Sequence, residues 1–248
     1  MPPDPSSLRL PKRITPCSIV NATVEVRFQT NLPPSIVPGL IYGAVRERFA
    51  KREETPEGTM PEALRAANPV LRYRPTVVLA GETFALHVGP RTLYLAMIGS
   101  DYPGWSAYRE TCAWVMEKIR PLEVIKTPER LGLRYTDFFE SPVKDRLQVD
   151  LLLGGQSQVG EPFEFTCHMR REGFQCVVRV GSSVLLETSK GNRPGCVLDV
   201  DLGFAVEPGQ FWNSAIAEFD RAHKVQKRLF FEELLQPSFL ATLNPQYD

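Results

Sequence analysis

The sequence lacks an excess of charge of either sign, a long hydrophobic run and a signal-peptide core. Its 248 residues carry 29 lysines and arginines against 29 aspartates and glutamates, so the formal net charge is zero. A domain that holds a nucleic-acid duplex is usually basic, because neutralised phosphates supply much of its affinity. No apolar run approaches the roughly 18 residues that a membrane span needs. We therefore expect a cytoplasmic protein without a membrane partner.

Metal-binding and nucleophile motifs are also missing. The five cysteines form no C-x-x-C pair, which is typical of reduced thiols. The three histidines, His87, His168 and His223, form neither H-x-x-x-H nor H-E-x-x-H, so we predict no metal. The chain has no G-x-S-x-G, no G-x-x-x-x-G-K-[ST] and no G-x-G-x-x-G. These absences predict no cofactor and favour a protein that is not an enzyme.

The chain is expected to divide into a flexible tail at 1–16 and two α+β halves, 17–140 and 141–248, packed as one unit. Five prolines in the tail withhold amide donors from helices and ladders. Residues 22–28 alternate between apolar and polar side chains, which predicts a half-buried strand. Ser141-Pro142 predicts the start of a short helix that runs to about residue 153.

The remaining periodicities predict three longer helices and a series of strands. Apolar residues at helical spacing indicate helices at 38–52, 105–122 and about 211–235. Strand-like runs, with a hairpin turn expected at 181–183, lie at 70–81, 83–89, 92–99, 130–139, 163–170, 174–181, 183–190 and 196–204. We predict an α+β fold of antiparallel sheets with packed helices. Two ferredoxin-like or pseudo-repeated α+β halves would be its finer form.

Two acids, Asp199 and Asp201, form the pattern with the most chemical character. Residues two apart on a strand share a face, so both carboxylates would project together about 7 Å apart. Such a pair can hold Mg²⁺ or divide acid and base roles, and Glu187 and His223 would extend it. The alternative, which we favour, is the exposed face of an ordinary half-buried strand. Asp199, Asp201 and His223 are thus weak catalytic candidates.

Basic residues offer a candidate site for nucleic acid or another anion. Arg221, Lys224 and Arg228 form one stripe of the last predicted helix, and a solvated helix face is the alternative interpretation. Arg134 and Tyr135 place a guanidinium beside an aromatic ring that could stack a base. An ordinary pair of strand residues is the alternative there.

Aromatic residues in the last predicted helix offer a candidate partner interface. They exceed what a single buried stripe needs, which indicates a partner or dimer surface. The alternative is that they fill both sides of the chain's own core. The interface candidates are Phe211, Trp212, Phe219 and Phe231.

Three segments resemble a known family. CSIVNATVEVRFQT is similar to its opening strand, RLGLRYTDFF to its central R-x-G-x-R-Y block, and VLDVDLGF with FDRAHKVQKRLFFEEL to its closing strand and helix. The family is a sporadically distributed, uncharacterised bacterial one of about this length, and the resemblance spans 17–235. It implies no catalytic residues, and its patchy distribution suits mobile-element or defence-associated genes.

Three functional hypotheses follow. The first is a non-catalytic interaction protein, an accessory, immunity or antitoxin-like subunit associated with mobile elements or phage defence. Its partner would be another protein subunit or a second copy in a homodimer. The second is an RNA-binding or RNA-processing protein that uses a ferredoxin-like sheet, Arg134, Tyr135 and the basic stripe. The third is a carboxylate-metal hydrolase that uses Asp199 and Asp201.

Overall fold

A computed structural model describes residues 10–140, 142–158, 162–188 and 191–247. Residues 1–9 of the predicted tail, and Ser141 at the predicted helix start, lie outside the described residues. The described chain has an α+β fold, as predicted, built on one antiparallel sheet of nine strands. In their order across the sheet, the strands are β2 (Lys51–Glu54), β3 (Val77–Ala80), β4 (Phe84–Gly89), β5 (Thr92–Met97), β1 (Ile19–Gln29), β6 (Thr127–Phe139), β11 (Gly191–Phe204), β10 (Phe174–Thr188) and β9 (Glu164–Arg171).

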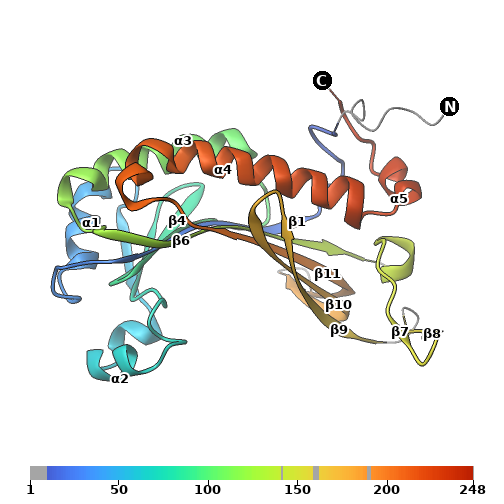
Figure 1. Cartoon of the computed structure of the whole chain (residues 1–248), viewed down its shortest axis with the longest axis horizontal. Helices are drawn as coiled ribbons and strands as arrows, with labels where there is room; N and C mark the ends of the chain where they lie inside the picture. Colours follow the sequence, from blue (N-terminus) through green and yellow to red (C-terminus); the bar gives the residue numbers. More distant parts are fainter. Residues whose placement is uncertain (1–9, 141, 159–161, 189–190, 248) are drawn as a thin grey trace.

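Helices cover one face of this sheet. Figure 1 shows α3 and α4 lying along that face, with α2 projecting from the opposite side. The described helices are α1 (Val37–Val45), α2 (Glu62–Ala67), α3 (Trp105–Ile119), α4 (Phe211–Arg228) and α5 (Pro237–Thr242). A π-helical segment, Leu229–Leu234, continues α4, so the predicted helices at 105–122 and 211–235 are confirmed.

The alternation predicted for 22–28 is confirmed and sets the two faces of the sheet. Ala22, Val24, Val26 and Phe28 are buried toward the helices, while Asn21, Thr23, Glu25 and Arg27 lie on the other side. The strand registers extend this second side across the sheet, because Thr23 pairs with Arg134, and Arg134 with Asp201. We call the side opposite α1, α3 and α4 the polar face.

The core lies between the sheet and the helices. Phe28, Leu131 and Leu198 are fully buried there, and burying each such side chain contributes about 1.5–3 kcal/mol. The buried Tyr108 hydroxyl of α3 donates a hydrogen bond to the Ala22 carbonyl oxygen at 2.5 Å. This bond satisfies the one polar atom of a large buried ring and ties α3 to β1.

Two predicted helical stretches are wrong. The helix predicted at 38–52 ends at Val45, and its last part is strand β2, whose Arg52 pairs with Leu79 of β3. Charged residues suit this position, because an edge strand rich in charge resists pairing with other chains. The described part of the helix predicted up to residue 153 is a 3-10 turn, Val143–Asp145, followed by a hairpin of β7 (Leu152–Leu153) and β8 (Gln156–Ser157).

The predicted hairpin turn at 181–183 is also wrong. Strand β10 continues through it, and the register with β11 shifts between Gly181 and Val184. The Gly-Ser-Ser sequence therefore forms a β-bulge. Glycine within a strand often marks a bulge, just as glycine and serine often mark a turn. Strands of both predicted halves share the sheet, because β6 pairs directly with β11.

The described part of the predicted tail is hydrogen-bonded to the other end of the chain. The Lys12 amide donates to the Gln246 carbonyl, and the Thr15 amide to the Leu243 carbonyl, both at 2.7 Å. Ile14 between them is buried. In the described ranges, no helix has both the length and the apolar character needed to cross a membrane.

Candidate functional site

Asp199 and Asp201 both lie on the polar face, and arginines bind both carboxylates. Arg134 donates from Nε to Oδ1 of Asp199 at 2.6 Å and from Nη2 to Oδ2 at 2.9 Å. Arg179 of β10 adds a bond from Nη1 to Oδ2 at 3.0 Å. The hydrogen bonds to Asp199 raise the pKa of the Arg134 guanidinium above its usual value. Asp199 is therefore a buried anchor for two arginines.

Arg130 joins Asp201 to Glu25 on the same face. Its Nη2 donates to Oδ1 of Asp201 at 2.6 Å, and its Nη1 to Oε2 of Glu25 at 2.7 Å. The side chain crosses Gly132 and Gly203, which are register partners on β6 and β11. A Cβ at Gly203 would lie 3.0 Å from the Arg130 Nε, and one at Gly132 would overlap Nη1. The two glycines thus leave the space in which this guanidinium lies across the sheet.

The paired acids are not assembled with the other residues proposed for hydrolysis. His223 lies on the helix-covered side, and Glu187 lies eight residues beyond Arg179 along β10, roughly 25 Å away at the usual strand rise. Within the described ranges, no group of three His, Cys, Asp or Glu side chains is placed to hold a metal ion.

His223 lies in an aromatic cluster between α4 and the sheet. Its ring stacks on Trp105 with centroids 4.7 Å apart, and its Nδ1 lies 3.2 Å from the Tyr135 hydroxyl. Burial, with the nearby Lys227 charge, lowers the pKa of His223 to about 4. Tyr135 is buried in this cluster, on the face opposite Arg134. The predicted role of Tyr135 in stacking a base is therefore wrong, because neighbouring strand residues point to opposite faces.

The predicted basic stripe lies on α4, away from the polar face. Arg221 contacts Glu218 at 2.7 Å and lies over the Phe174 ring, while Arg228 contacts Glu172. Lys224 is exposed. Two of the three charges are thus engaged with acids of the same chain, in surface pairs that each contribute little to stability.

The aromatic residues of α4 mainly fill the chain's own core. Phe211 and Phe219 are 1% and 2% exposed, so their predicted role in a partner interface is wrong. Trp212 and Phe231 are partly buried against the same core. Phe211 and Phe219 lie eight residues apart on the one buried stripe of α4 and pack into the chain's own core.

A cavity of about 520 Å³ lies on the polar face. It is bounded on one side by strands β4, β5, β1, β6 and β11 and on the other by residues 69–75. Its charged and hydrogen-bonding lining includes Asn21, Thr23, Glu25, Arg27, Arg74, Arg130, Arg134 and Asp201. The volume falls in the range of small-ligand sites.

Two stacked rings form part of the cavity wall. His87 of β4 and Tyr94 of β5 are register partners whose centroids lie 4.3 Å apart with planes 10° from parallel. Burial lowers the pKa of His87 to about 4, so the imidazole is neutral near pH 7. The pair therefore offers a flat, uncharged aromatic surface beside the arginines.

The segment that contributes the second wall of the cavity, residues 55–76, is called the arm here and includes α2. The Thr55 hydroxyl donates to the Pro75 carbonyl at 2.7 Å, and the Thr76 amide donates to the Val88 carbonyl at 2.8 Å. Gly58 lies so close to the Thr76 carbonyl that a Cβ there would overlap it. These contacts hold both ends of the arm against the sheet.

Tyr73 docks the far part of the arm on the polar face. Its hydroxyl donates to Oε2 of Glu129 at 2.7 Å, and the Arg27 guanidinium lies 5.0 Å from its ring centroid. Burial would raise the pKa of Glu129, but hydrogen bonds from Gln29 and Tyr73 and the charges of two arginines lower it overall. Sequence analysis missed the arm, because residues distant along the chain create its cavity.

No protein-family model matches the chain. A search of curated proteins finds no match either.

Proposed function

We propose that the polar face binds single-stranded RNA, with the 520 Å³ cavity as the centre of the site. The observation that carries this proposal is the placement of four arginines and two stacked aromatic rings in one cavity. Proteins bind single strands with positive grooves that follow the backbone and aromatic side chains on which bases stack. An exposed β-sheet face is one surface on which such recognition occurs.

The ion pairs on the face decide which arginines are free for phosphate. The Arg134 side chain remains 52% exposed although it contacts Asp199. Arg74 is exposed, and in the described part of the chain it contacts no carboxylate within ion-pair distance. Arg74 lies on the arm and Arg134 lies on β6, so the two arginines line different parts of the cavity. They would contact successive phosphates, since each guanidinium can bind phosphate oxygens through two N–H groups.

Two polar residues favour RNA over DNA. Asn21 and Thr23 of β1 line the cavity and present an amide and a hydroxyl. Such groups can donate to and accept from a ribose 2′-hydroxyl, which is the group that distinguishes RNA. We also propose that the protein acts in the cytoplasm and needs no cofactor for this binding.

The test is fluorescence anisotropy with a labelled single-stranded RNA of about eight nucleotides, within the usual site size. Arg74→Ala should weaken binding by about tenfold or more, because a charge-assisted contact contributes about 1.5–3 kcal/mol. Lys224→Ala is the matched control, because Lys224 is exposed on α4 at the other side of the sheet. Equal losses in both variants, or no binding by the unaltered protein, would contradict the proposal.

A protein partner is the second candidate, favoured by exposed aliphatic side chains on two projections. The arm exposes Leu64 and Val70, at 61% and 69%, and the β7–β8 hairpin exposes Leu152 and Leu153, at 58% and 62%. Apolar groups of this size at projecting tips suit a binding interface. If another protein subunit binds there, this chain would have the accessory, immunity or antitoxin-like role. Light scattering of the purified protein tests the homodimer form of this candidate, and a monomer mass would exclude it.

A further inference from the structure

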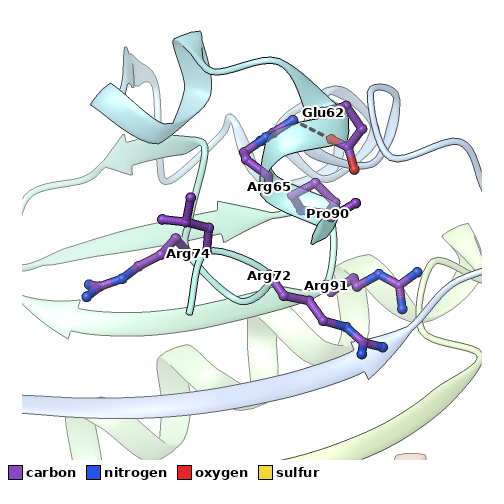
Figure 2. A pocket seen from close by; sticks show the side chains of 8 residues that line it. Glu62, Arg65, Arg72, Arg74, Pro90 and Arg91 are labelled. Atoms are coloured by element: carbon purple, nitrogen blue, oxygen red, sulfur yellow. Dashed lines mark hydrogen bonds and ion pairs between the residues drawn. The ribbon is translucent and has the colours of Figure 1, made fainter. Parts of the chain in front are cut away.

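A second, smaller cavity lies between the arm and the turn that joins β4 to β5. It has a volume of about 270 Å³, and its lining comes from the arm and from Pro90 and Arg91 of the turn. Four arginines and one acid line it: Arg65, Arg72, Arg74, Arg91 and Glu62. Figure 2 shows the guanidinium groups of Arg72 and Arg91 directed to one side and that of Arg74 directed to the other. Arg74 also lines the larger cavity, so the two cavities are neighbours.

Arg65 carries hydrogen-bond donors that the protein leaves unused. Its Nη2 donates to Oε2 of Glu62 at 2.5 Å. Its Nε and Nη1 are buried and have no hydrogen-bond partner among the described residues. Buried N–H groups without a partner are rare in proteins. Protein atoms cover these two, so an anion in the cavity would reach them only after the Arg65 side chain moved.

The charges around this cavity are only partly balanced. Glu62 contacts Arg65, and Glu129 lies 3.6 Å from Arg72. Arg74 and Arg91 contact no carboxylate within ion-pair distance in the part of the chain that the structure describes. The volume of about 270 Å³ is close to the lower end of small-ligand sites, about 300 Å³. A compact group with more than one negative charge therefore fits better than a complete nucleotide.

We propose that this arginine pocket binds a phosphate monoester dianion, the terminal phosphate of the RNA strand held in the neighbouring cavity. The ligand's identity as RNA rests on the proposed function, whereas the pocket's chemistry does not. A terminal phosphate has three free oxygens, and guanidinium groups bind them through paired N–H donors. An internal phosphodiester has two such oxygens and one charge, so it would leave more of the donors unused.

The experiment compares three RNAs of one sequence that carry a 5′-phosphate, a 3′-phosphate or hydroxyls at both ends. Anisotropy should show about tenfold tighter binding for one of the phosphorylated strands, because charge-assisted hydrogen bonds are gained. Arg91→Gln should remove that preference while leaving the affinity for the unphosphorylated strand within about twofold. Arg46→Gln is the matched control, because Arg46 is exposed at the end of α1. Arg65→Gln, checked for folding by circular dichroism, provides a second variant.

Pyrophosphate serves as a separate probe, with thermal unfolding as the readout. Stabilisation by pyrophosphate that Arg91→Gln abolishes, in a protein that binds no RNA, would support the pocket and overturn the RNA ligand. Equal affinity for all three RNAs would overturn the terminal-phosphate site and leave the RNA proposal standing. No response to RNA or pyrophosphate would overturn both.

Discussion

Arg134 and Asp199 form a two-point ion pair across β6 and β11, with N–O distances of 2.6 and 2.9 Å. The carboxylate is nearly buried, while the guanidinium remains about half exposed. This asymmetry means that Asp199 orients Arg134 without withdrawing it from solvent. An arginine held in this way is preorganised, since little side-chain freedom remains to be lost on binding.

Replacing Asp199 should release its arginines and reduce stability modestly. In Asp199→Asn, Arg134 and Arg179 lose a charged partner but stay solvated, so the free energy of unfolding should fall by about 1–2 kcal/mol. RNA affinity should rise about fivefold at low salt, because losing a negative charge on the face outweighs losing the orientation that Asp199 gives Arg134. Urea unfolding and anisotropy measure the two effects. Glu233→Gln, which removes an exposed partner of Arg171, is the control and should leave RNA affinity unchanged.

Gly132→Ala should displace Arg130 from its place across the sheet. The new methyl group would overlap Nη1 of Arg130, so the guanidinium would lose its contacts with Glu25 and Asp201. We expect a loss of about 1–2 kcal/mol of stability, typical of overpacking that a flexible side chain can relieve. Gly43→Ala is the control, because a Cβ there meets open space on α1. Gly43→Ala should raise the unfolding midpoint, because alanine is favoured over glycine inside a helix. An unfolding midpoint of Gly132→Ala equal to that of the unaltered protein would show that Arg130 does not need the glycine.

The buried Asp137 predicts a pH dependence of stability. Burial, offset by a hydrogen bond from Ser18 and increased by the Asp199 charge, raises the pKa of Asp137 to about 7. The unfolded chain ionises near pH 4, so the folded state binds more protons between the two values. The contribution of Asp137 to stability is therefore complete below about pH 4 and is lost as pH rises to about 7. From pH 5 to pH 8 the loss should be about 3 kcal/mol.

Asp137→Asn isolates this effect, because His87 and His223 titrate in the opposite sense. The pKa of each histidine is lowered to about 4, so their contribution is complete above about pH 6.5 and is lost as pH falls toward 4. The difference in unfolding free energy between the variant and the unaltered protein should grow in favour of the variant from pH 5 to pH 8. The unfolding free energies of both proteins are measured with urea across this pH range. If they changed with pH in parallel, the raised pKa of Asp137 would be contradicted.

Gly58→Ala should detach the base of the arm. A Cβ would overlap the Thr76 carbonyl, which belongs to backbone and cannot yield as a flexible side chain does. We expect weaker RNA binding by about tenfold or more, because residues 69–75 would no longer hold their place as one wall of the cavity. The β-sheet signal in circular dichroism should stay intact. Unchanged RNA affinity would show that the arm takes no part in binding.

Local periodicity predicted the sheet strand at 22–28 and the helices at 105–122 and 211–235, because each buries one regular face. It failed at Lys51–Glu54, whose charges give no strand signal and whose pairing with β3 is a tertiary contact. The shared face of Asp199 and Asp201 was predictable, but the arginines that bind them come from β6 and β10. The arm cavity was beyond sequence analysis, since its two walls lie on separate parts of the chain.

The salt dependence of RNA binding tests the central proposal most directly. If the polar face contacts about four phosphates, the logarithm of the association constant should fall with the logarithm of salt concentration at a slope near −3. The double variant Arg74→Ala/Arg134→Ala should reduce that slope to about −1.5, because two contacts are removed. A slope near zero, or an unchanged slope in the double variant, would contradict RNA binding at the polar face.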